Sequence, residues 1–440
     1  EAESNGLTAI PEFERFTFTP RWFYSVSDKT NLDLGVGIVD ETRLGGSTEY
    51  IAGRAPDEYF ESNQSQRVFT RIEFAHQFDD SLGFSLKNAN SRFDRSLEVP
   101  DFRFAGAQVS TFSEMALTKT NADSDWVLGL NVTTERFEQD ENTVEFDYNY
   151  SEHTVGAFGQ YTRDVSETLI VEGGLRVDSH SDYGSFVLPR VSFLFLPTPD
   201  LTMRFGAGFG YKAPSMFISE ADELQFKNLL PINSSELDGE ESKGFNLDIN
   251  HHLEIADGAS LTSNLLFFYT EIDGKVEISE RRGLNAFSPL DYPVQTQGVE
   301  LNLIFGFEEL RYFAGYTYVD ATQQTPAGDI DLPLVSKHRF NNVLVWERED
   351  NFRIGLEAYY FSEQLRDDDV AGQSYWIFGL MTEKKIGRSI TAFLNFENFT
   401  DTRQTRYENI NRADLISPDF RGVYAPLDGF VVNGGVRIEW

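Results

Sequence analysis

The stretch Phe352-Arg353-Ile354-Gly355-Leu356-Glu357-Ala358-Tyr359-Tyr360 shows the pattern that decides the fold. Apolar side chains occupy every even position, whereas the odd positions include Arg353, Gly355 and Glu357. Because successive residues of a β-strand point to opposite faces, this alternation predicts a strand with one apolar face and one polar or small face. The same period of two recurs at 390–397 and at 432–440.

The length of these runs separates two kinds of all-β protein. Strands of soluble proteins usually have about 5–6 residues, whereas a tilted strand that crosses a membrane needs roughly 9–11. The runs are of the longer kind, and we count about nineteen of them, with the first at Phe13–Ser27 and the last at Gly429–Trp440. A particularly long run is predicted over Ser260–Ile278. The lengths favour a membrane barrel over a soluble sandwich.

The connections between the runs alternate strictly between short and long. Short connections include Asp79-Asp80 and Asp257-Gly258, whereas long ones include 42–65, 212–240 and 400–428. Short turns on one rim and long loops on the other are typical of outer-membrane barrels. The sequence therefore predicts an all-β fold, a transmembrane antiparallel β-barrel in the outer membrane of a Gram-negative bacterium.

This order of connections also gives the direction of each strand. The last strand follows a long connection and the first precedes a short one, so both run from the outside toward the periplasm. They can share a direction only if the strand count is odd, whereas single-chain bacterial barrels have an even count. We therefore interpret residues 1–440 as one barrel domain from which an odd number of strands before Glu1 is missing.

Composition and charge exclude other classes of protein. No apolar run approaches the ~20 residues of a membrane-spanning helix, so a helical membrane bundle is excluded. The absence of cysteine excludes disulfide scaffolds and thiolate metal sites. With 71 acidic and 37 basic residues the formal net charge is −34, which repels phosphates, so we expect no nucleic-acid partner. The same charge either attracts cationic ligands or forms a solvated acidic surface.

Five segments in order along the chain carry a resemblance to a known family. They are Gly206–Phe217, Glu241–Leu247, Thr296–Leu301, Leu332–Arg339 and Asn395–Arg403. Together they resemble characteristic stretches of the TonB-dependent outer-membrane receptors, with Lys212 where that family usually has Arg. Proteins of this family import metal chelates, cobalamin and some glycans. Near the N-terminus, Pro11–Phe16 resembles members of the family from Bacteroidetes.

The resemblance implies a 22-stranded barrel that is filled by an N-terminal plug domain. About nineteen strands here would leave three strands and the plug absent from this chain. The implied function is TonB-energised uptake of a scarce nutrient, which could be a ferric siderophore or other metal chelate, cobalamin or a glycan. The implied partners are outer-membrane lipid, TonB acting through the absent plug, the small-molecule ligand, a surface lipoprotein, and the barrel-assembly machinery, which would read the C-terminal Trp440. No catalytic residue, cofactor or resident metal is implied.

Two alternative functions stay open at this point. A passive porin-like channel would have an open lumen lined by polar side chains such as Arg353, Glu357 and Arg437. A barrel hydrolase would need an activated nucleophile, but the chain has no G-x-S-x-G stretch. We therefore expect that the protein is not an enzyme.

Aromatic side chains in or beside the long connections are the candidates for ligand contact, because such rings stack on sugar rings and on siderophore aromatics. They could equally pack the loops together or belong to the outer aromatic girdle. The candidates are Tyr50, Tyr59, Tyr148, Tyr292, Tyr407 and Tyr424.

Other motifs are weaker signals. The six histidines show no H-x-x-x-H or H-E-x-x-H spacing, so no metal site is predicted. The run Asp367-Asp368-Asp369 could bind Ca²⁺ through oxygen ligands, although a solvated charge run is favoured. The glycines of Gly206–Gly210 are predicted to lie in a strand and to let other groups approach it closely.

Overall fold

The alternating runs are long strands of one antiparallel sheet in the computed structural model, which describes residues 6–8, 10–140, 146–366 and 368–439. The all-β prediction is confirmed. The 21 strands of the sheet are β1 (Glu12–Phe18), β2 (Arg21–Ser27), β3 (Thr30–Gly46), β4 (Phe60–Gln77), β5 (Leu82–Val99), β6 (Phe102–Thr120), β7 (Ser124–Gln139), β8 (Tyr150–Ser166), β9 (Leu169–His180), β10 (Gly184–Thr198), β11 (Leu201–Lys212), β12 (Glu240–Ala256), β13 (Ala259–Asp273), β16 (Val294–Phe307), β17 (Leu310–Gln323), β18 (Ile330–Asp331), β19 (His338–Arg348), β20 (Phe352–Phe361), β21 (Tyr375–Ile386), β22 (Ile390–Glu397) and β23 (Val431–Ile438). Outside it are the hairpin of β14 (Val276–Arg281) and β15 (Leu284–Pro289), the short helices α1 (Thr48–Ile51) and α2 (Ser219–Glu223), and the 3-10 helix η1 (Gln404–Arg406).

The first predicted strand, Phe13–Ser27, is one path along the sheet but is interrupted. Both β1 and β2 pair with β3, and Thr19-Pro20 separates them. Proline has no N–H to donate to the ladder, although the Pro20 carbonyl still accepts from the Val36 amide at 3.2 Å. If β1 and β2 count as one strand and the two-residue β18 is left out, the sheet has nineteen long strands, as the sequence predicts.

The predicted run Ser260–Ile278 is wrong at its end. β13 stops at Asp273, and Gly274 follows it with a φ of +68°, which a glycine adopts without strain. The chain then leaves the wall and forms β14, which pairs with β15 alone. The predicted long loop at 212–240 also contains ordered structure, namely α2.

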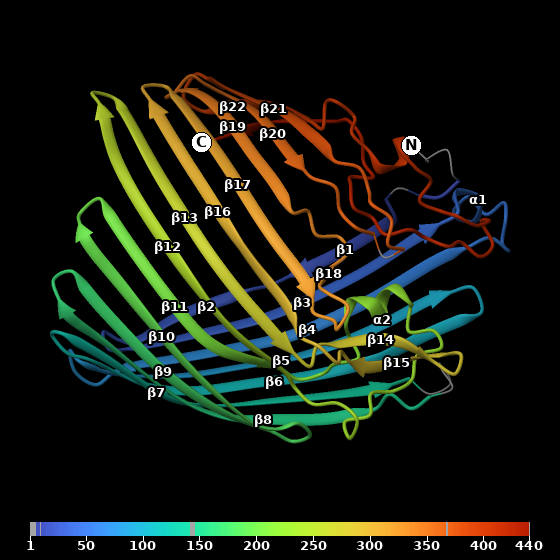
Figure 1. Ribbon diagram of the computed structural model, residues 1–440, viewed down its shortest axis with the longest axis horizontal. Coiled ribbons are helices and arrows are strands. Elements are labelled where there is room, and N and C mark those ends of the chain that lie inside the picture. Colours follow the sequence, from blue (N-terminus) through green and yellow to red (C-terminus); the bar gives the residue numbers. More distant parts are fainter. Residues whose placement is uncertain (1–5, 9, 141–145, 367, 440) are drawn as a thin grey trace.

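Most short and long connections lie at opposite ends of the sheet, as predicted, but two connections at the end with the long loops are tight: residues 100–101 between β5 and β6, and residues 181–183 between β9 and β10. Figure 1 shows tight turns gathered at one end of the slanting strands and the long loops at the other, together with α1, α2, β14 and β15. We call these the short-turn end and the long-loop end. Because a strand pair needs only a two-residue turn, the extra residues at the long-loop end are free to build a site.

The two faces of the wall differ as the alternation predicts. On β7 the outward side chains of Trp126, Leu128, Leu130 and Val132 are at least 40% exposed, whereas the intervening Asn131 is buried on the inner face. Such an outward apolar band is the surface that lipid covers in membrane barrels. On β7 and β8 the band ends at the paired Val132 and Val155, because the next outward residues toward the long-loop end are Thr134 and His153.

Aromatic rings form a girdle on the outer face near the long-loop end. Tyr316 and Phe340 lie 4.8 Å apart between ring centroids, Phe340 and Tyr360 5.8 Å, and Tyr360 and Trp376 5.0 Å. The four residues come from the neighbouring strands β17, β19, β20 and β21. Aromatic girdles of this kind mark the boundary between membrane and water.

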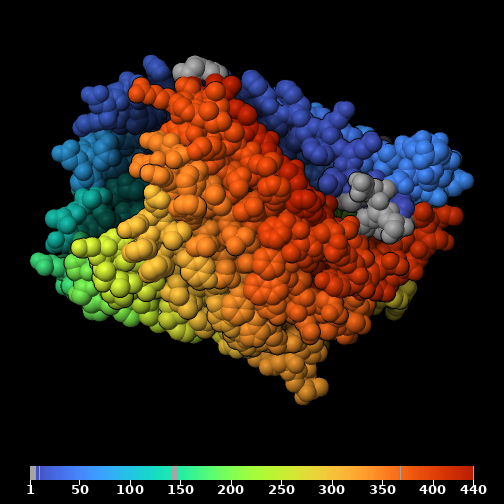
Figure 2. Space-filling view, turned by 90° about the horizontal axis from the view of Figure 1, so that it is seen from above, coloured from blue at the N-terminus to red at the C-terminus, as the bar shows by residue number. Residues whose placement is uncertain are grey.

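The first and last parts of the sheet meet through loops and not through paired strands. Among the residues that the structure describes, no backbone pairing joins β23 to β1 or β2. At the long-loop end, however, the loop after β3 meets the loop after β22: the Tyr59 amide donates to the Leu415 carbonyl at 2.7 Å, and the Tyr59 ring lies 5.9 Å from that of Phe420. Figure 2 shows the first and last segments, blue and red, on the same side of the molecule.

The described part of the chain contains no helix that has both the length and the apolar character needed to cross a membrane.

The outward position of Leu130 gives a test of the membrane band. Leu130→Lys should destabilise the barrel by about 2–4 kcal/mol, because it places an ammonium group against lipid. Phe112→Lys on the adjacent β6 is the control: Phe112 lies on the inner face, so its lysine can reach water. Urea unfolding of both variants in lipid vesicles would measure the difference. Equal losses would contradict the assignment of the two faces.

Candidate ligand site

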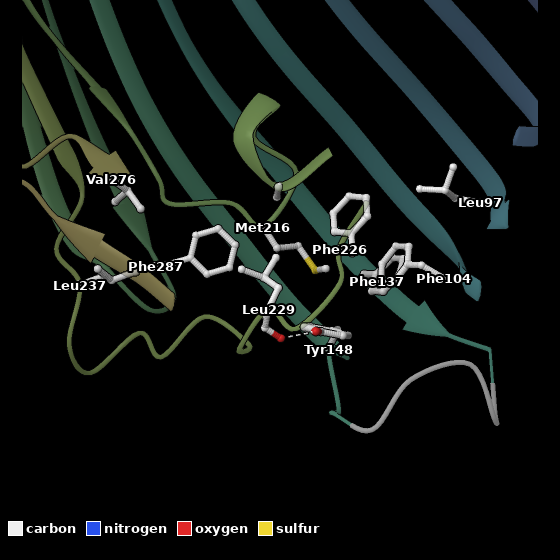
Figure 3. Packing of buried hydrophobic residues seen from close by; sticks show 11 residues of the cluster. Leu97, Phe104, Phe137, Tyr148, Met216, Phe226, Leu229, Leu237, Val276 and Phe287 are labelled. Carbon is white, nitrogen blue, oxygen red and sulfur yellow. Dashed lines mark hydrogen bonds between the residues drawn. The ribbon is translucent and has the colours of Figure 1, made fainter. Parts of the chain in front are cut away.

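The inner wall at the long-loop end is covered by a folded cap. The β11–β12 loop (213–239) and the β14–β15 hairpin pack against inward side chains at the ends of β5, β6 and β7 (Figure 3). The buried members of this cluster are Leu97, Phe104, Phe137, Tyr148, Met216, Ala221, Phe226, Leu229, Leu237, Val276 and Phe287. The cap is therefore held by a hydrophobic core of its own, inside the barrel mouth.

Aromatic contacts fix the cap to the strands. The ring of Phe226 in the cap stacks on Phe104 of β6 at 4.2 Å, and Phe217 meets Phe137 of β7 edge-on at 5.2 Å. The Tyr148 hydroxyl donates to the Leu229 carbonyl. Because offset-stacked and edge-on aromatic pairs stabilise beyond the area that they bury, these contacts make the cap a fixed part of the wall.

A pocket with a volume of about 280 Å³ lies beside this cap, and we call it the Glu152 pocket. Its walls come from the β7–β8 loop with the start of β8, from the β9–β10 turn, and from both ends of the β11–β12 loop. The lining residues are Asp147, Tyr148, Asn149, Tyr150, Ser151, Glu152, Asp182, Tyr183, Pro214, Ser215, Met216, Pro231, Ile232 and Ser234.

The charged residues that line this pocket are all acidic. Its lining includes the carboxylates of Asp147, Glu152 and Asp182, and none of its lining residues in the described part of the chain is Lys or Arg. Glu152 lies beyond Val155 and hence outside the membrane band. Burial, together with the nearby charges of Glu135 and Asp182, raises the pKa of the Glu152 carboxyl from its ordinary value of 4.5 to about 7.

His180 is the histidine next to Glu152, and it does not supply a positive charge at neutral pH. The His180 Nδ1 accepts from the Asp182 amide at 3.1 Å, so the neutral ring carries its proton on Nε2, which lies 3.9 Å from the Glu152 carboxylate. Burial lowers the pKa of His180 below its ordinary value. The ring therefore favours its neutral form above pH 6.5 and leaves the acidic pocket uncompensated.

The six tyrosines that the sequence predicts as ligand contacts lie in different surroundings in the structure. Only Tyr148 lines the Glu152 pocket, where burial raises its pKa to about 12. Tyr50 stacks on Phe60 at 4.5 Å between ring centroids, and Tyr59 accepts a hydrogen bond from Gln225 at 2.6 Å. Tyr292 and Tyr407 are exposed. The six residues thus do not form one site, and their contact with a ligand stays a prediction.

Tyr424 belongs to a second cluster of loop residues, away from the Glu152 pocket. It is buried with Tyr375, whose hydroxyl donates to the Tyr424 carbonyl at 2.9 Å. Beside it, Glu408 pairs with both Arg366 and Arg421. Burial alone would raise the pKa of Glu408, but hydrogen bonds from the two guanidinium groups outweigh it and hold that pKa low.

One residue of the acidic run Asp367-Asp368-Asp369 pairs with an arginine of the same cluster. Asp368 pairs with Arg366 at 3.0 Å, so it is neither a free calcium ligand nor simply solvated. Asp367 and Trp440 lie outside the described residues. In the described part of the chain, no group of three or more His, Cys, Asp or Glu side chains is arranged to hold a metal ion.

The glycine-rich stretch lies inside β11, as predicted. At Gly208 an added Cβ would lie 3.2 Å from the Arg190 Cβ on the neighbouring strand. The glycine thus makes room for a side chain of the adjacent strand.

Sequence reasoning missed the carboxylates of this pocket. Glu152 is one of 71 acidic residues, and it lies in an alternating run that predicts only a strand. Asp182 and Tyr183 lie in the short turn between β9 and β10, and a short turn does not by itself predict a ligand loop. The available signal was the pair of inward positions Glu135 and Glu152, which place two carboxylates face to face across β7 and β8.

Comparison with known proteins gives a consistent match. A family model described as TonB-dependent receptor-like β-barrel matches residues 8–399. A curated relative, the ferric enterobactin receptor of Pseudomonas aeruginosa, is 21% identical over 295 residues, which cover 57% of this chain and 38% of the relative. This chain thus spans about two fifths of the length of that relative.

Solved structures show the same fold. A mutant of the Pseudomonas aeruginosa ferric enterobactin receptor has a TM-score of 0.73 at 13% identity, covering 99% of this chain and 71% of the other. The copper transporter OprC has a TM-score of 0.75 at 15% identity, covering 98% and 72%. The siderophore receptor PirA from Acinetobacter baumannii has a TM-score of 0.72 at 13% identity, covering 98% and 72%.

The hydrogen bond of Tyr148 can be tested separately from ligand contact. Tyr148→Phe leaves the buried Leu229 carbonyl without its donor, so we expect the cap to loosen by about 1–3 kcal/mol. Hydrogen exchange of residues 224–232 would measure this loss in the absence of ligand. The exposed Tyr407→Phe is the control and should change stability by less than about 0.5 kcal/mol. Unchanged exchange in the first variant would show that the bond contributes nothing.

The raised pKa of Glu152 predicts a pH-dependent stability. Between pH 4.5 and about 7 the folded protein keeps a proton that the unfolded chain has released, so stability falls as pH rises through this window. Glu152→Gln removes this loss, and should therefore stabilise the protein more at pH 8 than at pH 5.5, by at most about 2 kcal/mol. Unfolding of the full chain at both pH values would measure it. Asp291→Asn, an exposed carboxylate in the β15–β16 loop, is the control and should act equally at both.

Proposed function

Because the chain belongs to the TonB-dependent receptor-like β-barrel family, we propose that it forms the wall of a receptor that imports a scarce nutrient with energy from TonB. The fold of this family implies an outer-membrane β-barrel. As the ligand class we propose a ferric siderophore or another metal chelate, with cobalamin and glycans as the alternatives. The relatives named as receptors for ferric enterobactin and as a copper transporter support this choice.

The observation that carries this proposal is the cap inside the barrel mouth. At the long-loop end the β11–β12 loop and the β14–β15 hairpin fold inward and build a core against the inner wall. Beside that core they leave the Glu152 pocket, with charged, aromatic and apolar groups converging on it. A convergent pocket of this kind is the usual form of a site that selects a small molecule.

In the proposed mechanism the loops capture the ligand from outside, and the pocket holds part of it at the barrel mouth. TonB would then act through a plug domain, and that plug and the missing strands stay predictions. The surface lipoprotein partner and the recognition of Trp440 by the assembly machinery also stay predictions. In this mechanism the cap and pocket residues position the ligand, and no chemical reaction of the ligand is required.

Uptake by the native protein in its own outer membrane tests this function. A strain that lacks the gene should lose uptake of at least one radiolabelled ferric chelate, and the intact gene should restore it. Deleting TonB should abolish the same uptake. Uptake that persists without TonB, with ion conductance of the purified full-length protein in a planar bilayer, would instead show a passive channel.

A further inference from the structure

We propose that the Glu152 pocket binds a positively charged arm of the ligand, an alkylammonium group on a short apolar chain, so that the receptor selects cationic metal chelates over neutral and anionic ones. This inference rests on the proposed uptake function, because it names the class of chelate that the receptor takes. The net charge of −34 predicts at most a general attraction of cationic ligands, whereas this inference places the selection in one pocket.

The first argument is the unmatched charge of the pocket. Two other carboxylates at the long-loop end have cationic partners: Asp222 lies 2.8 Å from Arg95, and Glu236 lies 3.0 Å from Arg281. The Glu152 carboxylate has no such partner in the described part of the chain; its nearest basic group is His180, at 3.9 Å. A partly buried carboxylate without a counter-charge is costly, and a bound cation would remove that cost.

The neighbours of Glu152 strengthen this preference. Glu135 on β7 and Asp182 in the β9–β10 turn add negative charge on two sides, and Asp147 adds more from the β7–β8 loop. Glu135 is already held by hydrogen bonds from Tyr150 and from Gln108. Glu152 accepts no hydrogen bond from another side chain among the described residues, and is therefore the group that a ligand can engage.

The walls fit the rest of such an arm. The rings of Tyr148, Tyr150 and Tyr183 line the pocket, and aromatic faces attract ammonium groups. Met216 and Ile232 add apolar surface for the methylene groups of a chain. Pockets that enclose a drug-sized ligand have volumes of about 300–1,000 Å³, so 280 Å³ suits an arm while the chelated metal stays outside.

A series of chelates that differ only in charge tests the proposal. Ferric desferrioxamine B carries one alkylammonium arm and a single positive charge, its N-acetyl derivative is neutral, and its N-succinyl derivative is anionic. Equilibrium binding to the purified full-length protein should be tightest for the cation, by about tenfold over the neutral derivative, and weakest for the anion. Raising the pH from 6 to 8 should tighten only the binding of the cation, because Glu152 loses its proton in that range.

Variants assign the preference to the pocket. Glu152→Gln and Asp182→Asn should each weaken the binding of the cation about tenfold and leave the neutral derivative unchanged. Asp291→Asn makes the same change in net charge on an exposed loop and should alter neither. The resistance of each variant to limited proteolysis shows that it is folded, and the isosteric glutamine and asparagine keep the packing.

The outcomes separate this inference from the proposed function. Equal or tighter binding of the neutral or anionic derivative, or binding of none of the three, overturns the charge selection even if another ferric chelate is imported. Loss of the preference in Asp291→Asn would show that general surface charge, not the pocket, is responsible. Cation binding that depends on Glu152 without any TonB-dependent uptake would support the pocket and overturn the transport function.

Discussion

The pairing of backbone groups is the constraint on which the rest of the structure depends. Lipid offers no hydrogen-bond partner, so every N–H and C=O in the membrane region must be satisfied within the protein. The long antiparallel ladders do this from β3 through β22, and the period of two then sorts side chains between an outer face for lipid and an inner face. Once the wall is built in this way, specificity can come only from the inner face and from the loops.

The outer face contains one informative polar cluster. Asn88 and Asn90 of β5 and Thr111 of β6 point outward, at the level of Ile72 and Thr70 on β4. Asn90 donates to the Asn88 side chain at 2.7 Å and accepts from Thr111 at 3.0 Å. Thr111 pairs with Thr134, just beyond the apolar band of β7, so these polar groups satisfy one another at the edge of the band.

The cap and the pocket beside it have opposite physical characters. The cap is held by close-packed rings such as Phe104 and Phe226, which exclude water and keep the loop in one arrangement. That rigidity allows the pocket to keep Glu152 and Asp182 close together without a counter-charge, because the strands and the cap prevent them from moving apart. Stability supplied by the apolar cluster thus offsets the electrostatic cost of the acidic site.

The sequence by itself determined the barrel, the end at which most long loops lie, and the face of each strand, because alternation along a strand is a local property. It could not determine the site. Tyr148 and Tyr424 look alike in sequence, yet one lines the pocket and the other is buried with Tyr375. Glu152 and Asp182 are brought together by the pairing of β8 with β9, and the inward folding of the cap adds Ile232. Such convergence depends on long-range packing, which period and composition do not encode.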